Sequence, residues 1–216
     1  MKLIYLSIAL ALISFTQTSF GADVLTLNPG TQTCEGITLA ESATLNLPSS
    51  QVNLISVGYG LRTKRVAIVN VKVYCATFLV SEPGAYLRTS KTTNDTLSST
   101  DSMSAVAFRL DFVRNVDAAT VSQSFADALN ANNVDLTKPS VAAFLAAVKN
   151  GGDVQSGKAL TIAGDEKTGL VLYQSTTGSI QSIQGDAALV HAIVSIWLGN
   201  PADSGLATLK SELIGG

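Results

Sequence analysis

Val66–Val80 (VAIVNVKVYCATFLV) is the clearest β-strand of the 216-residue sequence. Successive side chains of a strand point to opposite faces of a sheet. One face of this strand is mostly apolar and carries Ala67, Val69, Val71, Val73, Cys75, Thr77 and Leu79. The other face is mixed and carries Asn70, Lys72, Tyr74 and Ala76. The stretch therefore predicts a sheet with one face in a core and the other in a wetter environment.

The segments on either side predict further strands and helices. Period-two patterns predict strands at 36–47, 51–57, 105–113, 159–163, 170–174 and 179–183. Helical spacing of apolar residues predicts helices at 117–130, 140–149, 186–198 and 203–214. Since consecutive strands are joined without crossover helices, we expect an α+β fold. Its sheet is largely antiparallel and its helices pack on one face.

Glycine and small polar residues predict where these elements end. Gly58-Tyr59-Gly60 is expected to form a tight passage after the second strand, because glycine permits close backbone approach. Gly164 and Gly178 are expected in hairpin turns. The Ser/Thr-rich segment Thr89–Ser104 is expected to be a loop within one domain, not a boundary between two.

Composition excludes several classes of protein. Apolar residues make up 46% and charged residues 14%, a balance opposite to that of disordered chains. The formal charge of −2, without a basic stripe, argues against nucleic acid as a partner. One His and two Cys argue against a Cys/His zinc site, and we expect neither a metal nor a cofactor.

The N-terminus has the pattern of a secretory signal peptide. Lys2 precedes an apolar run at residues 3–15, and Ser19 and Gly21 suit positions −3 and −1 of a cleavage site after Gly21. The alternative is an uncleaved anchor, but the run is shorter than the roughly 20 residues that a span needs. We therefore expect a signal peptide at residues 1–21, a single domain at 22–216, no stable membrane anchor and a periplasmic location.

Export to an oxidising compartment permits a disulfide between Cys34 and Cys75. Two buried thiols on strands explain the same residues, and the sequence leaves both possibilities open.

The sequence lacks the familiar catalytic motifs. His191 is the only histidine and lies in an apolar helical segment, where a packed or partner-bonded side chain is the simpler interpretation. There is no Gly-x-Ser-x-Gly elbow, phosphate-binding loop or dinucleotide fingerprint. We therefore expect no enzymatic activity from these classes.

An ordered set of short motifs carries a resemblance. It starts with Gly58-Tyr59-Gly60-Leu61-Arg62 and, twelve residues after Arg62, Tyr74. Further motifs in the same order are Phe112–Val116, Gly157-Lys158, Ile196–Gly199 before Pro201, Leu209-Lys210 and Leu213–Gly215. Over most of residues 36–216 the chain resembles the chalcone isomerase-like family. That resemblance implies an open-faced β-sandwich, in which a large antiparallel sheet is covered by a layer of helices with a ligand cleft between them.

The resemblance also implies a choice between two functions. Plant members of the family cyclise a chalcone phenolate, whereas non-catalytic relatives bind fatty acids with the same Arg and a Tyr in place of a Thr. Arg62 matches the Arg, and Tyr74 falls at the Thr position. Val121, Ala128 and Ile196 fall at three positions that are polar in the isomerases, although Ser195 adjoins the last of them.

These matches favour a non-catalytic protein that binds a small apolar carboxylate or phenolic ligand, such as a fatty acid. Arg62 and Tyr74 would hold the anion, and Val121, Ala128 and Ile196 would form the pocket wall. Two alternatives are an intramolecular lyase of the chalcone isomerase type and an envelope interaction module with a vestigial cleft. Arg62 could equally be a turn arginine paired with a surface carboxylate, and Trp197 is most simply a core residue.

Overall fold

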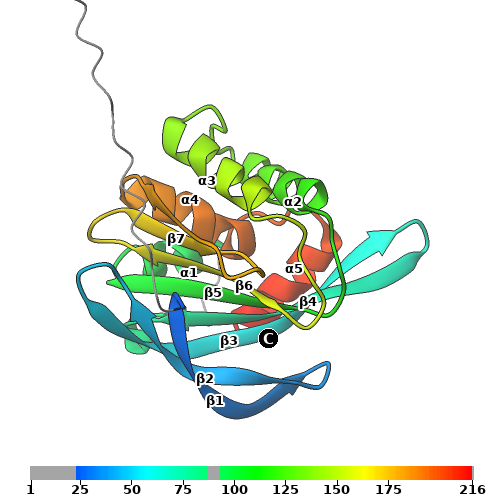
Figure 1. Ribbon diagram of the computed structural model, residues 1–216, viewed down its shortest axis with the longest axis horizontal. Coiled ribbons are helices and arrows are strands. Elements are labelled where there is room, and N and C mark those ends of the chain that lie inside the picture. Colours follow the sequence, from blue (N-terminus) through cyan, green and yellow to red (C-terminus); the bar gives the residue numbers. More distant parts are fainter. Residues whose placement is uncertain (1–22, 87–92, 216) are drawn as a thin grey trace, which may run out of the picture.

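The computed structural model describes residues 23–86 and 93–215, and the expected signal peptide lies outside these ranges. Eight strands form one antiparallel sheet in which each strand pairs with the next along the chain (Figure 1). The strands are β1 (Leu25–Cys34), β2 (Ile37–Asn46), β3 (Gln51–Val66), β4 (Val69–Val80), β5 (Ala105–Phe112), β6 (Ala159–Asp165), β7 (Leu170–Gln174) and β8 (Ile180–Gln184). The helices are α1 (Thr93–Thr100), α2 (Ala118–Ala131), α3 (Pro139–Asn150), α4 (Ala187–Leu198) and α5 (Ser204–Leu213), and η1 (Pro83–Ala85) is a 3-10 turn.

The main core lies between one face of the sheet and a layer of helices (Figure 1). Its centre is a stack of rings in which Phe108 lies between Phe78 and Trp197, at centroid distances of 4.5 and 4.2 Å. Phe125 of α2 meets the Trp197 ring edge-on. The stack joins β4 and β5 to α4 and α2, so it fixes the helical layer above the middle of the sheet. This arrangement confirms the expected α+β fold and the core position of Trp197.

A second, smaller core covers part of the opposite face of the sheet. Small residues such as Ala105, Ala107 and Ala163 of the central strands meet larger side chains from the N-terminal strands. The Val24 N–H donates to Gln174 Oε1 at 3.0 Å, so the start of the chain lies against β7 although β1 is at the other end of the strand order. The sheet is therefore curved back on itself.

Cys34 and Cys75 form a disulfide with a Cα–Cα distance of 6.1 Å. This result decides between the two possibilities that the sequence left open. The bridge joins the end of β1 to the middle of β4 and closes a separation of 41 residues.

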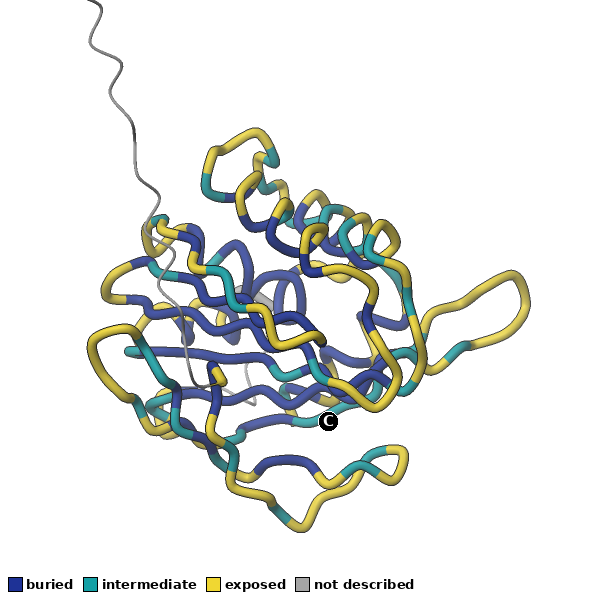
Figure 2. Tube along the Cα trace, in the orientation of Figure 1, coloured by how far each residue is buried: buried dark blue, intermediate teal, exposed yellow. Residues whose placement is uncertain are grey.

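The β3–β4 hairpin extends beyond the rest of the sheet, and most of its outer part is exposed (Figures 1 and 2). Tyr74 is the last β4 residue that pairs with β5, and its partner there is Phe112. Past this point β3 and β4 pair only with each other, and the pairs from Thr63↔Lys72 to Val66↔Val69 form a two-stranded arm. The strand expected over 66–80 is thus split by a turn at Ala67-Ile68.

A register shift in this hairpin overturns the expected alternation of faces. Arg62 pairs with Tyr74, but Thr63 pairs with Lys72, so Val73 is the extra residue of a β-bulge. A bulge breaks the period of two. As a result Val71 and Val73 line the same pocket as Tyr74, whereas Lys72 is paired with Glu35. The face of Tyr74 is therefore the one that meets the helical layer, and the prediction of a wetter face there was wrong.

Three local predictions also fail. Gly58-Tyr59-Gly60 lies inside β3, where its two glycines accommodate α5: a Cβ on Gly58 would collide with the Leu213 carbonyl. Gly164 lies inside β6, and the following turn ends instead at Gly169, which has a φ of +67°. Within Thr89–Ser104 the segment 93–100 is helical, because Leu97 reaches the main core.

Candidate functional site

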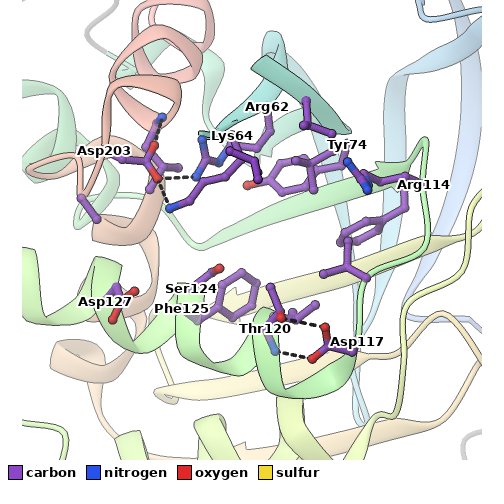
Figure 3. Close-up of a pocket in the computed structure, with 18 of the residues that line it drawn as sticks. Arg62, Lys64, Tyr74, Arg114, Asp117, Thr120, Ser124, Phe125, Asp127 and Asp203 are labelled. Carbon is purple, nitrogen blue, oxygen red and sulfur yellow. Dashed lines mark hydrogen bonds and ion pairs between the residues drawn. The ribbon is translucent and has the colours of Figure 1, made fainter. Parts of the chain in front are cut away.

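A cavity of about 340 Å³ lies between the β3–β4 hairpin and helices α2, α4 and α5. Figure 3 shows Arg62, Lys64, Tyr74 and Asp203 on one side of it and the side chains of α2 on the other. It is lined by Arg62, Lys64, Val66, Val71, Val73, Tyr74, Phe112, Arg114, Asn115, Val116, Asp117, Thr120, Val121, Ser124, Phe125, Asp127, Ile196, Ala202, Asp203 and Leu206. We call it the Arg62–Tyr74 cavity, because these two residues are its most buried polar side chains.

Arg62 and Tyr74 are brought together by strand register. They are direct partners in the antiparallel β3–β4 pair, so their side chains leave the sheet on the same face. Both residues are only 6% exposed. Gly205, in the first turn of α5, leaves room for this arrangement, since a Cβ there would collide with Arg62 Nη1 and the Thr63 carbonyl. The sequence placed both residues at one site, and the register explains why they meet.

Arg62 belongs to a three-residue charge cluster with Lys64 and Asp203. Arg62 Nη2 and Lys64 Nζ each lie 2.7 Å from Asp203 Oδ2, and Arg62 Nη1 donates to the Thr63 carbonyl. Asp203 is also the N-cap of α5 and accepts the Leu206 N–H through Oδ1. Burial alone would raise the pKa of Asp203, but these hydrogen bonds outweigh it and hold the pKa well below its ordinary value of 3.8. The cluster therefore carries two positive charges and one negative charge.

Tyr74 is positioned as a hydrogen-bond donor toward the cavity. The Trp197 Nε1–H donates to its hydroxyl oxygen at 3.1 Å, and the Tyr74 ring meets Phe112 edge-on at 5.3 Å. Burial raises the pKa of Tyr74 above 10, although the nearby Arg62 charge acts in the opposite direction. The phenol is thus neutral at physiological pH, and with Trp197 supplying the hydrogen that its oxygen accepts, its own O–H remains to be donated.

The rest of the cavity wall is mostly apolar. Val71 and Val73 come from β4 and Phe112 from β5, while Val121 and Ile196 come from α2 and α4. Val121 and Ile196 thus lie at the cavity, where the sequence comparison put them. Ala128 does not: it is fully buried away from the cavity lining, so its expected role in the pocket wall was wrong. It lies two helical turns beyond Val121, in the main core instead.

Several polar residues at the cavity were not predicted. Asp203 was expected only as the first residue of a helix, and its contact with Arg62 depends on how α5 crosses β3. Lys64 was not singled out in the sequence, and its Nζ forms an ion pair with Asp203. Arg114 lines the cavity with no hydrogen bond or ion pair to any residue that the structure describes. The pair of glycines in β3 was the sequence signal for the close approach of α5: close backbone approach was expected there, but as a tight passage after a strand and not inside one.

The α2 side of the cavity carries hydroxyl and carboxylate groups near its opening. Asp117 caps α2 and accepts from the Thr120 N–H at 2.8 Å and the Thr120 hydroxyl at 2.7 Å. Ser124 lies one turn further along, and Asp127 accepts from Gln123. Within residues 23–86 and 93–215, no group of three His, Cys, Asp or Glu side chains is arranged to hold a metal ion. No helix in those ranges has both the length and the apolar character needed to cross a membrane.

Comparison with known proteins gives a family and a set of structural neighbours. The model of the chalcone isomerase-like family matches residues 31–215. No curated protein matches the chain. The crystal structure of an Arabidopsis thaliana fatty-acid binding protein is similar in fold, with a TM-score of 0.59 and 15% sequence identity over 88% of this chain and 95% of that one. Because the family match spans nearly all of the described residues, this chain belongs to the chalcone isomerase-like family.

Proposed function

We propose that this chain is an exported, non-catalytic protein that binds an apolar carboxylate, such as a fatty acid, in the Arg62–Tyr74 cavity. The observation that carries the proposal is the convergence of a buried guanidinium and a buried phenol at one end of a cavity with apolar walls. A phenolate with an apolar body has the same chemistry and is the second ligand of this class. The fatty-acid binding named for the Arabidopsis neighbour supports the same class of ligand.

The charge of the cluster favours an anion as its ligand. Arg62, Lys64 and Asp203 together carry a net charge of +1, in a place where Arg62 is almost fully buried. A ligand carboxylate would bring the cluster to neutrality. Arg62 has five N–H donors, and it interacts with the Thr63 carbonyl, with Asp203 and with the Tyr74 hydroxyl. The remaining donors and the Tyr74 hydroxyl would hold the ligand oxygens by charge-assisted hydrogen bonds.

The apolar walls would hold the rest of the ligand. A volume of about 340 Å³ is at the small end of the range of roughly 300–1,000 Å³ found for small-molecule pockets. Each buried methylene contributes about 0.8 kcal/mol, part of which is offset by the ordering of the chain. The anchor would thus set the orientation of the ligand, and the walls would supply most of the affinity.

Two features support export as part of the proposal. Residues 1–21 have the composition of a signal peptide. The Cys34–Cys75 disulfide is typical of proteins in oxidising compartments such as the periplasm. A cell-fractionation experiment with N-terminal sequencing of the purified protein tests this part: an N-terminus at Ala22 in the periplasmic fraction is expected.

Ligand identity is tested by mass spectrometry of an organic extract of the purified protein, followed by titration with the acid that is found. The Arg62→Ala, Tyr74→Phe double variant should lose most of the affinity, because it lacks both anchors. Equal binding by the wild type and the double variant would remove the proposed site.

The isomerase alternative uses the same two residues for different chemistry. Arg62 would stabilise the developing anion, and Tyr74 would move a proton. The apolar residues Val121 and Ile196, at positions that are polar in the isomerases, favour binding over this chemistry. A chalcone cyclisation assay, which follows the loss of chalcone absorbance, separates the two: turnover that disappears in Arg62→Ala would replace our proposal. The interaction-module alternative predicts a cleft filled by side chains, which the cavity volume opposes.

A further inference from the structure

We propose that the turn Val66–Val69, at the end of the β3–β4 hairpin, is a second binding surface and docks on an anionic lipid bilayer. We call these four residues the hairpin tip. Ile68 is 89% exposed, Val69 59% and Val66 58%, and together they are three of the four large apolar residues that are exposed in the described part of the chain. The fourth, Ile55, lies near the other end of β3.

The hairpin tip is held away from the body of the protein. Four residue pairs of β3 and β4 lie beyond Tyr74, the last residue that β5 supports. At about 3.3 Å per residue they form an arm of roughly 13 Å. Figure 2 shows this arm as an exposed projection at one end of the molecule. A flat surface can therefore meet the tip before it meets the sheet or the helices.

Folding of the chain does not account for the apolar residues at the tip. Two-residue hairpin turns favour Asn, Asp and Gly, because these turns need left-handed backbone. Here Ala67 takes that conformation, with a φ of +52°, and Ile68 follows it. The Ile68 side chain is almost fully exposed, so it adds nothing to the stability of the core. Three exposed aliphatic residues at the end of an arm are instead suited to an apolar medium outside the protein.

The charged residues around the hairpin tip indicate that this apolar medium is an anionic membrane. Residues 62–74 contain Arg62, Lys64, Arg65 and Lys72 and no Asp or Glu, whereas the whole chain has a net charge of −2. Asp203 is paired with Arg62 and Lys64, and Glu35 with Lys72, so the positive charges of this segment still exceed the two carboxylates that contact them. Arg65 and Arg114 have no carboxylate partner among the described residues, and Arg114 follows Val113, which bonds the Val73 carbonyl at the base of the arm. An apolar tip surrounded by arginine and lysine complements the headgroups and acyl chains of an anionic membrane.

The position of the arm connects this surface to the Arg62–Tyr74 cavity. Val66 and Val71 line the cavity, and Val69 pairs directly with Val66, so apolar side chains continue from the tip to the cavity on one face of the hairpin. An acyl chain that leaves the bilayer at the tip would remain in contact with apolar side chains as far as the cavity. The docking does not depend on the proposed ligand, although this path would let an acyl ligand pass between the bilayer and the cavity.

Vesicle sedimentation tests the proposal. The chain from Ala22, which contains every described element, should sediment with phosphatidylcholine vesicles that contain phosphatidylglycerol and much less with pure phosphatidylcholine. Omitting residues 1–21 removes an apolar segment that would bind lipid by itself. Ile68→Asp should weaken binding by about tenfold or more, because burial of an aliphatic side chain of this size is lost. Arg65→Gln should weaken it less and reduce its dependence on salt.

Ile55→Asp is the matched control, since it makes the same change at an exposed isoleucine of β3 away from the tip. It should sediment as the wild type does. No binding to the anionic vesicles, equal binding by Ile68→Asp, or an equal loss in Ile55→Asp would overturn the proposal. Titration with free fatty acid in the absence of vesicles measures the cavity separately, so failure of one proposal is distinguishable from failure of the other.

Discussion

Asp203→Asn should raise the affinity of the cavity for a carboxylate and lower the stability of the protein. Asp203 competes with any incoming anion, because its Oδ2 already holds Arg62 and Lys64. Asn is as good an N-cap as Asp, so the hydrogen bond from the Leu206 N–H of α5 to the side chain at position 203 can be kept. The substitution therefore removes a charge from the cluster while retaining the start of the helix.

The size of both effects follows from the geometry. Two carboxylates that share one guanidinium lie about 5 Å apart, and at an effective dielectric constant near 20 they repel by about 3 kcal/mol. Screening by Lys64 and solvent reduces this repulsion to about half, which corresponds to a gain of roughly tenfold in affinity. Loss of one partner from a buried ion pair costs about 3–5 kcal/mol. Because the Asp203 side chain is 25% exposed and Asn can still accept a hydrogen bond, we expect about 2 kcal/mol.

Calorimetric titration with a fatty acid and urea unfolding measure the two quantities. Asp186→Asn is the matched control, since Asp186 caps α4 in the same way, by accepting the Leu189 N–H, and has no ion pair with any residue in the described ranges. The control should change neither affinity nor stability by much. If Asp203→Asn weakens fatty-acid binding, Asp203 positions Arg62 for the ligand instead of competing with it, and our description of the cluster is wrong.

Three further predictions concern the rest of the fold. Replacement of Cys34 and Cys75 by Ser should lower the free energy of unfolding by about 4 kcal/mol, given their separation of 41 residues, and urea unfolding that matches the oxidised wild type would contradict this. Gly58→Ala should lower the free energy of unfolding by about 2 kcal/mol or more, since its Cβ would collide with the Leu213 carbonyl and displace α5. Gly84→Ala is the control: its Cβ would meet no atom within 4 Å, so urea unfolding should show a loss of less than about 0.5 kcal/mol. Burial, with Asp101 and Asp165 nearby, raises the pKa of Glu166 to about 7 from 4.5, so the folded state binds more protons in this window and stability falls as the pH rises through it. In the Glu166→Gln variant, the decline in stability between about pH 5 and about pH 8 should be smaller by about 2 kcal/mol, after allowance for solvent screening. An unchanged decline would refute the assignment of this pH dependence to Glu166.

Most of the fold could be predicted from local patterns. Three predicted helices began at Asp117, Asp186 and Asp203, and in the structure each of these carboxylates accepts a backbone N–H of the first helical turn. Alternation located β5 and the three C-terminal strands, because their hairpins are regular. Such features depend on residues that are close in sequence, so the sequence contains the whole of their cause.

The failures arise where distant contacts decide the structure. The bulge at Val73 changes the face of Lys72 and Val71, and nothing in the alternating sequence marks it. The glycines of β3 have the composition of a turn, yet they serve the packing of α5, which is about 150 residues further along the chain. α1 is stabilised by the contact of Leu97 with the core, not by its Ser- and Thr-rich sequence.

The residues of the candidate site also fall into those that the sequence could predict and those that depend on distant contacts. Arg62 and Tyr74 were found through the resemblance, and strand pairing brings them together as a cross-strand pair. Asp203, Lys64 and Arg114 could not be assigned to the site, because their positions depend on where α5 and the segment after β5 lie in space. Ala128 was placed through the resemblance, at a position that is polar in the isomerases, and such a match cannot determine how far the cavity extends along α2.

The central claim is that Arg62 and Tyr74 hold the anionic end of an apolar ligand, and comparison of a fatty acid with its methyl ester tests it most directly. Calorimetry of the wild type should give an affinity at least about tenfold higher for the acid, because only the acid makes charge-assisted hydrogen bonds. In the Arg62→Ala, Tyr74→Phe variant this preference should disappear while the ester still binds. Equal affinities in the wild type, or the same preference in the variant, would contradict the claim.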